Sequence, residues 1–333
     1  MQKKSVIMSL MVVALLAFLT ACGAGTETGT ETGTEGTSFP EKRINIIVPW
    51  NAGGGGDQVA RALAPIVEEE LGQTVTVSNI TGGSGAVGYT EIHNADPDGY
   101  TIGIVGSSIS TLKPVGSVPF NSSDFEPIIA VNYDPAAIIV KDDAPWQTVD
   151  ELIEDAKANP GEILMGTSGT GGIWYLASLA FELKTDTEFN IIPDSGGAAP
   201  NMVKLLGGHV DVVAVGPNEA AAQLESGDAR ILTLMGPERM EAFPDAPTML
   251  EAGHDVEIIS SRGFLAPKGT PREVIDILHD AFSVAVESEH YQEFIRNNVS
   301  NSLNMDTDSY REFLKGDDQM FDELIRELGL DQQ

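Results

Sequence analysis

From residue 44 onward, short runs of apolar and mostly β-branched residues alternate with stretches that carry apolar residues at helical spacing. The short runs predict strands at 44–48, 75–77, 101–105, 138–140, 163–165, 210–215 and 231–234. Because these runs are almost wholly apolar, they favour strands buried on both faces, as in a parallel sheet. One predicted helix between them ends at Gly72 and buries a face made by Ala60, Leu63, Val67 and Leu71. This alternation predicts an α/β, doubly wound fold.

The first 38 residues have the pattern of an export signal followed by a linker. Two lysines precede an apolar run at 6–19, which is too short to span a bilayer comfortably. We interpret 1–21 as a lipoprotein signal peptide and Cys22, the only cysteine, as the lipidated residue. An ordinary secretory signal with a chance cysteine is the alternative. Residues 22–38 repeat Gly, Thr and Glu, which predicts a flexible tether.

The chain is strongly acidic and long enough for two domains. It has 50 Asp and Glu against 19 Lys and Arg, and its formal net charge is −31. Such a chain would be repelled by phosphate backbones, so nucleic acid is excluded as a partner. The roughly 295 residues beyond the tether exceed the usual size of a single hydrophobic core.

Motifs of common enzymes and cofactor sites are absent or incomplete. Residues 83–88 satisfy the dinucleotide pattern G-x-G-x-x-G, but no acidic residue ends a following strand about 20 residues on. The five histidines lack metal-ligand spacing, and neither a G-x-S-x-G nor an H-E-x-x-H motif occurs. We therefore expect no enzyme activity, no catalytic residue, no cofactor and no metal. An extracellular hydrolase, the competing class, would turn its ligand over.

Three predicted strand-to-helix turns are rich in glycine, at 51–57, 166–172 and 195–198. Each turn leads backbone N–H groups into a helix N-terminus, where unpaired donors and the helix dipole favour an anion. In open α/β sheets, turns of this kind lie beyond the carboxyl ends of the strands, where ligands bind. In any one turn the glycines could simply permit a tight bend. Three such turns in one chain favour a binding site.

Several segments, taken in order and spacing, resemble one family of receptors. They are IVPW at 47–50 with the glycine turn after it, NITGGSG at 79–85, DPDGYT at 96–101, LLGGHVD at 205–211, FPDAPT at 243–248 and LAPKGTP at 265–271. Together they resemble the Bug, or TctC-like, substrate-binding proteins of tripartite tricarboxylate transporters. The resemblance covers nearly the whole chain beyond the tether.

The resemblance implies a two-lobed fold of the periplasmic-binding-protein type (type II), with a ligand cleft between the lobes. We place the two chain crossings near 141–145 and 260–264. The first lobe is then 39–142 plus 262–333, and the second lobe is 143–261.

The function implied by the resemblance is the capture of a small carboxylate and its delivery to a two-subunit membrane permease. We expect an extracytoplasmic monomer held at the cell membrane by its lipid anchor. A receptor that presents its ligand to a sensor kinase is the alternative, because no motif marks the partner-facing surface.

Carried onto this sequence, the resemblance implies a binding site built from turns of both lobes. The expected contacts are Asn51, Gly54, Gly55, Gly56, Asp57, Ser107, Ser108, Thr167, Ser168, Gly169, Thr170, Gly171, Gly196, Gly197, Ala198 and Gly216. Asp57 could instead cap its helix. Arg262, at the second predicted crossing, is the best side-chain cation because its planar fork can bond both oxygens of a carboxylate. A surface role for Arg262 stays open.

Two segments depart from the pattern of the family. Residues 194–197 replace a stretch that carries a basic or aromatic residue in many relatives, and 172–175 replace a run of small hydroxyl residues. Trp174 and Tyr175 could stack on a ligand or pack in the core. The ligand could therefore differ from a tricarboxylate.

Overall fold

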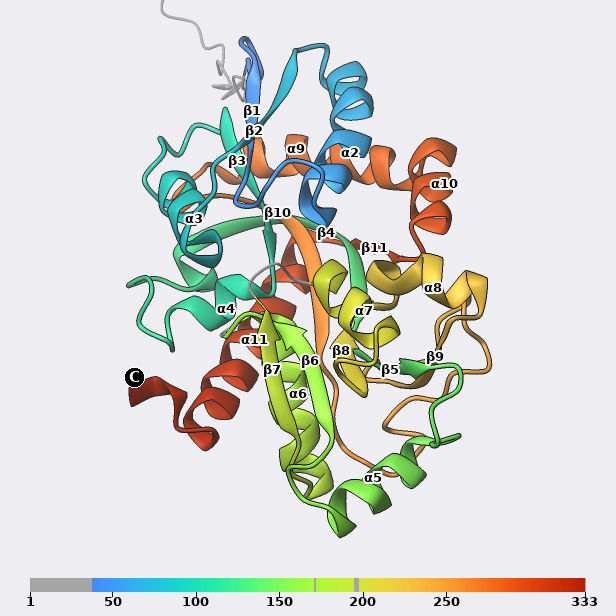
Figure 1. Cartoon of the computed structure of the whole chain (residues 1–333). Coiled ribbons are helices and arrows are strands. Elements are labelled where there is room, and N and C mark those ends of the chain that lie inside the picture. The colour runs from blue at the N-terminus through green and yellow to red at the C-terminus, as the bar shows by residue number, and fades with distance from the viewer. Residues whose placement is uncertain (1–37, 171, 195–197, 333) are drawn as a thin grey trace, which may run out of the picture. The chain divides into compact units, whose positions relative to one another are not determined.

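The structure is a computed structural model that describes residues 38–332, apart from Gly171 and 195–197. Two β-sheets with helices on their faces form this part of the chain (Figure 1), which confirms the predicted α/β class. The predicted signal peptide, Cys22 and nearly all of the tether lie outside the described residues, as do Gly171, Gly196 and Gly197. Within the described range, no helix is long and apolar enough to cross a bilayer.

The first lobe is built on a six-stranded sheet in the order β11-β4-β10-β3-β1-β2. Its strands are β1 (Ile44–Val48), β2 (Val75–Asn79), β3 (Thr101–Gly106), β4 (Phe125–Pro135), β10 (Ile259–Pro267) and β11 (Asn301–Met305). The parallel pairing expected from the apolar runs holds for β2, β1 and β3. Strands β10, β4 and β11, which the apolar runs did not predict, pair antiparallel. The parallel expectation is wrong for the runs at 138–140 and 231–234, because the strands that contain them pair antiparallel with each other in the second sheet.

Helices cover both faces of the first sheet. They are α2 (Gly55–Leu71), α3 (Ala86–His93), α4 (Ser108–Leu112), α9 (Arg272–Glu287), α10 (Glu289–Asn297) and α11 (Thr307–Glu327), with short 3-10 turns η1 (Gly83–Gly85) and η2 (Ser122–Asp124). The apolar faces of α2, α9 and α10 pack on one side, around Leu63, Phe282 and Tyr291. The apolar faces of α3, α4 and the first half of α11 pack on the other side, with Tyr89 and Tyr310 among the buried residues.

The second lobe is built on a five-stranded sheet in the order β7-β6-β8-β5-β9. Its elements are β5 (Ala137–Lys141), α5 (Val149–Ala158), β6 (Leu164–Ser168), α6 (Ile173–Thr185), β7 (Asn190–Asp194), α7 (Ala198–Leu206), β8 (Val212–Val215), η3 (Pro217–Ala220), α8 (Ala221–Ser226) and β9 (Ala229–Leu234); η4 (Leu330–Gln332) closes the described chain. Strands β7, β6 and β8 are parallel, whereas β5 is antiparallel to both of its neighbours.

The chain passes between the two sheets at two adjacent places. The sheets change between Pro135 and Ala137, where β4 gives way to β5, and again just before Ile259, where β10 begins. The backbones meet there, because Ala136 N–H donates to Ile258 O at 2.9 Å and Ile258 N–H donates to Met235 O at 2.8 Å. Since the chain leaves the first lobe by β4 and returns by β10, these two strands run side by side in opposite directions.

These positions differ from the crossings expected from the sequence. The segment 141–145 lies one strand too late, because β5 already belongs to the second sheet, and 260–264 lies inside β10. Helix α11 also does not belong to one lobe alone. Its residues Phe321 and Ile325 pack in the core of the second lobe, although its first half packs on the first.

Candidate functional site

A cleft of about 560 Å³ lies between the ends of strands from both lobes. We call it the interlobe cleft and define it by its lining residues. These are Trp50, Asn51, Gly54, Gly55, Gly56, Ser84, Gly106, Ser107, Ser108, Thr111, Leu112, Ser168, Gly169, Thr170, Gly172, Ile173, Trp174, Glu219, Ser260 and Arg262. A second hollow, of about 490 Å³, is lined by second-lobe residues such as Lys141 and Asp155. Only the interlobe cleft, of these two, is lined by helix N-termini and by residues of both sheets.

The first-lobe wall of the cleft contains the start of α2. Its N-cap residue is Gly54, which offers no side chain to the helix amides. The first helix amide to find a backbone acceptor is that of Gln58, which donates to Gly54 O at 3.0 Å. In the described part of the chain, the N–H groups of Gly55 and Gly56 have no acceptor, and both residues line the cleft. Unpaired amides at the positive end of a helix dipole attract an anion.

Glycine at position 56 is required by close packing. A Cβ atom added there would lie 2.6 Å from the ring of Trp50, which also lines the cleft. Trp50 in turn packs edge-on against Tyr89, with ring centroids 6.0 Å apart. The turn therefore lies against a fixed aromatic wall, which holds the α2 amides in place.

Asp57 does not line the cleft, although it is one of the expected contacts. Its side chain is buried, and it accepts hydrogen bonds from Gly53 N–H at 2.8 Å, Asn79 Nδ2 at 2.9 Å and Arg61 Nε at 3.0 Å. Burial opposes ionisation, but these donors outweigh it and lower the pKa of Asp57. The position of Asp57 favours a structural role, in which it ties the turn to the start of its helix and to Asn79 at the end of β2.

Ser107 and Ser108 line the cleft after β3. The Ser107 hydroxyl donates to Ile259 O at 3.2 Å and accepts from Ser261 N–H at 3.1 Å, which fastens the turn to β10. The hydroxyls of Ser108 and Tyr89 lie 2.8 Å apart. Both serine hydroxyls are therefore engaged by the protein. Behind Ser107, burial raises the pKa of Asp317 to about 7.

The second-lobe wall contains the start of α6. Ser168, Gly169 and Thr170 line the cleft, and the Ser168 hydroxyl accepts from Tyr175 N–H at 3.1 Å. Gly172 is the N-cap and provides no side-chain acceptor. The N–H groups of Ile173 and Trp174 have no acceptor among the residues that the structure describes.

The sequence left two roles open for the aromatic pair at the start of α6, stacking on a ligand or packing in the core. Trp174 is buried and also lines the cleft, whereas Tyr175 is half-buried and does not line it.

Three further expected contacts lie behind the walls of the cleft. Thr167 is buried in β6, with its hydroxyl directed to Ala214 O. Ala198 is buried at the start of α7, and Gly216 is the buried N-cap of η3. None of the three lines the cleft. Every expected contact, whether in the wall or behind it, stays a prediction as a ligand contact.

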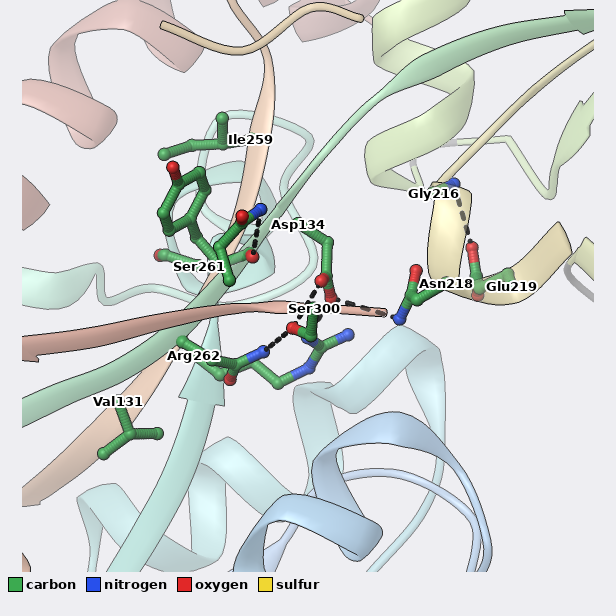
Figure 2. A network of polar contacts seen from close by, with 12 residues as sticks. Val131, Asp134, Gly216, Asn218, Glu219, Ile259, Ser261, Arg262 and Ser300 are labelled. Carbon is green, nitrogen blue, oxygen red and sulfur yellow. Dashed lines mark hydrogen bonds and ion pairs between the residues drawn. The ribbon is translucent and has the colours of Figure 1, made fainter. Parts of the chain in front are cut away.

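Arg262 lies in the cleft as part of a polar network that joins the lobes (Figure 2). Its Nη1 donates to Asp134 Oδ2 at 2.6 Å, and the Asp134 side chain is 0% exposed. Asp134 also accepts from Ser300 Oγ at 2.6 Å and, across the lobes, from Asn218 Nδ2 at 3.2 Å. The Arg262 side chain is 14% exposed, so a surface role is excluded.

Part of the Arg262 guanidinium remains available to a ligand. Within the described residues, Nε and Nη2 have no hydrogen-bond acceptor. A Cβ atom added to Gly55 would lie 3.0 Å from Nη2, so this edge of the guanidinium faces the start of α2. Burial works against the charge of Arg262, but Asp134 and Glu219 raise its pKa. The guanidinium is thus a fixed cation beside unpaired amides.

Glu219 is a lining residue that the motifs did not reveal. It follows Asn218 in η3, and its Oε2 accepts from Gly216 N–H at 3.2 Å. Glu219 keeps an exposed surface because it faces the cleft, while nearby protein atoms desolvate its carboxylate in part. This desolvation raises its pKa, while Gly216 N–H and the charge of Arg262 oppose the rise.

Ser84 is a second residue that the sequence did not reveal. It lines the cleft in a left-handed conformation, with φ 56° and ψ 29°, which is unfavourable for a residue with a side chain. The glycine-rich segment around it was the available signal. That segment satisfies the dinucleotide pattern and carries part of the family resemblance, but neither assigns Ser84 to the cleft.

Comparison with known proteins identifies relatives over most of the chain. The family model described as "Tripartite tricarboxylate transporter family receptor" matches residues 59–330. Protein BugT of Bordetella pertussis is 32% identical over 301 residues, which cover 88% of this chain and 91% of BugT.

Solved structures show the same arrangement. The crystal structure of a TctC solute-binding protein from Polaromonas has 34% identity and a TM-score of 0.79, covering 87% of this chain and 100% of that one. MatC from Rhodopseudomonas palustris, solved with bound malate, has 21% identity and a TM-score of 0.74, covering 86% and 100%.

Proposed function

Because the chain belongs to the tripartite tricarboxylate transporter receptor family, we propose that it captures a small carboxylate in the interlobe cleft for a two-subunit membrane permease. The family is one of extracytoplasmic solute-binding receptors and not of enzymes. Its members therefore bind a solute and release it unchanged.

The observation that carries the proposal is the convergence of two uncapped helix N-termini on one cleft. The amides of Gly55 and Gly56 come from the first lobe, and those of Ile173 and Trp174 come from the second. Among the described residues these four N–H groups have no acceptor, and they suit a group with several acceptor lone pairs, such as a carboxylate. The free edge of Arg262 adds charge-assisted donors beside them. Malate, bound by a protein of this fold, is a small molecule of this chemical class.

We propose that the lobes close on the ligand by rotation about the two crossings. The backbone there is a narrow connection around Ala136 and Ile258, and the Asn218–Asp134 hydrogen bond spans the lobes beside it. Closure would expel water and bring the starts of α2 and α6 onto the same carboxylate. The closed form is then the state that the permease recognises.

The net charge of −31 does not prevent the capture of an anion. At ordinary ionic strength, charges more than about 10 Å apart are largely screened. The acidic surface therefore slows the encounter, whereas the amides and Arg262 determine the affinity inside the cleft.

A thermal-shift screen of mono-, di- and tricarboxylates, amino acids and aromatic acids tests the proposal. A ligand present at 100 times its Kd stabilises the folded state by about 2.7 kcal/mol, which is a readily visible shift. Neutral sugars of similar size serve as controls and should give no shift. A sugar that stabilises the protein, with no response to any acid, would contradict the proposal.

We further propose that Cys22 carries the lipid that holds the protein at the outer face of the cell membrane, and that the protein is a monomer. Membrane fractions of cells that express the wild type should retain the protein. Cys22→Ser should release the protein into the soluble extracytoplasmic fraction, because residue 22 then has no thiol to carry the acyl chains. Retention of the Cys22→Ser protein in the membrane would exclude this anchor.

A further inference from the structure

Glu219 gives the cleft a charge that a simple carboxylate receptor does not need. Among the described residues that line the cleft, Glu219 alone is acidic and Arg262 alone is basic. The Glu219 carboxylate has a defined position, because Gly216 N–H donates to its Oε2 at 3.2 Å (Figure 2). Its exposed surface is directed at the space where a ligand would lie.

Arg262 does not neutralise Glu219, because Arg262 is already paired. Its Nη1 contacts the fully buried Asp134 at 2.6 Å. The charges of Arg262 and Asp134 cancel, so an ionised Glu219 leaves the side chains of the cleft with one net negative charge. A ligand that carries carboxylates alone would bring like charge next to Glu219.

Asp57 cannot provide this function in place of Glu219. Its carboxylate is buried behind the turn and accepts from Gly53, Asn79 and Arg61. Asp57 therefore has its cation and its donors within the protein. Glu219 is the carboxylate that lacks a cation of its own and faces the cleft.

We propose that Glu219 selects, among small carboxylates, one that also bears an ammonium group, so that the ligand is a small aminocarboxylate. This inference rests on the proposed function. The ligand carboxylate contacts the helix-start amides and the free edge of Arg262, and the ammonium contacts Glu219. A hydroxyl group would leave the negative charge of Glu219 uncompensated, whereas an ammonium group would cancel it.

The two poles lie within reach of one small molecule. Arg262 and Glu219 interact electrostatically, and a chain of contacts joins them from Arg262 through Asp134 to Asn218, the neighbour of Glu219. The positive pole and the negative pole are thus adjacent. This arrangement suits a ligand whose ammonium and carboxylate are a few bonds apart.

Matched pairs of acids that differ only in the ammonium group test the inference. Isothermal titration calorimetry is performed with aspartate and succinate, glutamate and glutarate, and alanine and propionate. For the pair that binds best, the wild type should bind the amino member at least about tenfold more tightly, the effect of one charged hydrogen bond. Glu219→Gln should abolish that preference by weakening the amino member, while the desamino acid binds as before or better.

Glu225→Gln is the matched control. Glu225 is exposed in α8, outside the cleft, so the same loss of one charge should leave the tenfold preference intact. Thermal unfolding midpoints establish that each variant is folded. If Glu219→Gln does not fold, the affinities of the wild type for the amino and desamino acids still test the inference.

Two results separate the inference from the proposed function. Binding of these acids with no ammonium preference, or a preference that survives in folded Glu219→Gln, would overturn the role of Glu219 and leave carboxylate capture standing. Failure of all six acids and of every other carboxylate in the screen to bind would overturn both.

Discussion

Asp57 and Glu219 occupy the same local position at two helix starts beside the cleft but have opposite environments. Each is the third residue of a helix whose N-cap is glycine, Gly54 or Gly216, and each accepts a nearby backbone N–H. Arg61 and Asn79 complete the shell of Asp57 and lower its pKa. Among the described residues Glu219 forms no ion pair, and desolvation raises its pKa.

The comparison shows that the two acids have different roles, one structural and one directed at the ligand. Asp57, in the first lobe, uses its carboxylate to fix the turn before α2, which leaves the first α2 amides available to an anion. The second-lobe acid stays available to the cleft and adds discrimination. The two acids have the same local position in a helix, so the side chains placed beside each one, such as Arg61 and Asn79 beside Asp57, decide its role.

The largest expected effect comes from removing the cation that lies near Glu219. Arg262→Met leaves Asp134 buried with its ion pair broken, and this should lower the free energy of unfolding by about 3 kcal/mol or more. Urea denaturation measures the change. Arg272→Met, which removes an exposed residue paired with Asp276 and Asp308, is the control and should cost less than about 1 kcal/mol. Equal small losses in both variants would show that the buried pair has no special weight.

The next largest effect is on ligand binding. It comes from a substitution that makes the second-lobe wall of the cleft repel an anion. Gly169→Asp places a negative side chain beside the start of α6, where a carboxylate should lie, and should weaken binding of the best ligand by about 100-fold or more. Calorimetry gives the affinity, and thermal unfolding establishes that the fold persists. Gly316→Asp adds the same charge at an exposed position of α11. A Cβ atom there meets no atom within 4 Å, so this control should leave binding intact. Undiminished affinity in Gly169→Asp would move the site elsewhere.

The smallest expected effect is a difference between Asp57 and Glu219 in how their contributions to stability depend on pH. Because the pKa of Asp57 is lowered on folding, its contribution is present at neutral pH and is lost as pH falls through its folded pKa. The raised pKa of Glu219 works in the opposite direction, since its contribution is lost as pH rises through its folded pKa. At pH 8, Asp57→Asn should therefore destabilise by about 1–2 kcal/mol, whereas Glu219→Gln should be neutral or slightly stabilising.

Urea denaturation from pH 4 to pH 8 measures both variants beside the wild type. The deficit of Asp57→Asn should shrink towards low pH, and any gain of Glu219→Gln should vanish there. Parallel behaviour of the two variants would contradict the assignment of opposite roles.

The apolar runs predicted part of the fold well. The strand at 44–48 matches β1, and the runs at 101–105 and 231–234 lie within β3 and β9. These strands are buried and rich in β-branched residues, so their pattern is local. Strands β4 and β10, which carry the chain between the lobes, were not predicted.

Polar residues concealed those two strands. Asp134 lies in β4 and Arg262 in β10, positions that would argue against burial in an isolated sequence. They are tolerated because each satisfies the other across 128 residues, with Ser300 and Asn218 as further partners. Such compensation depends on tertiary contacts and leaves no periodic signal.

The site shows the same limit. The glycine turns indicated the amides of α2 and α6, because uncapped helix starts follow directly from glycine at the N-cap. Glu219 could not be distinguished among 50 acidic residues, since only its neighbours in space set it apart. The internal role of Asp57 became evident only once Arg61 and Asn79 were placed beside it.

The most direct test of the central claim is a crystal structure of the protein with the tightest-binding acid from the screen. We predict one carboxylate within about 3 Å of a helix-start amide from each lobe, Gly55 or Gly56 on one side and Ile173 or Trp174 on the other. A ligand that binds with its carboxylate away from both helix starts, or with these amides directed out of the cleft, would contradict the account.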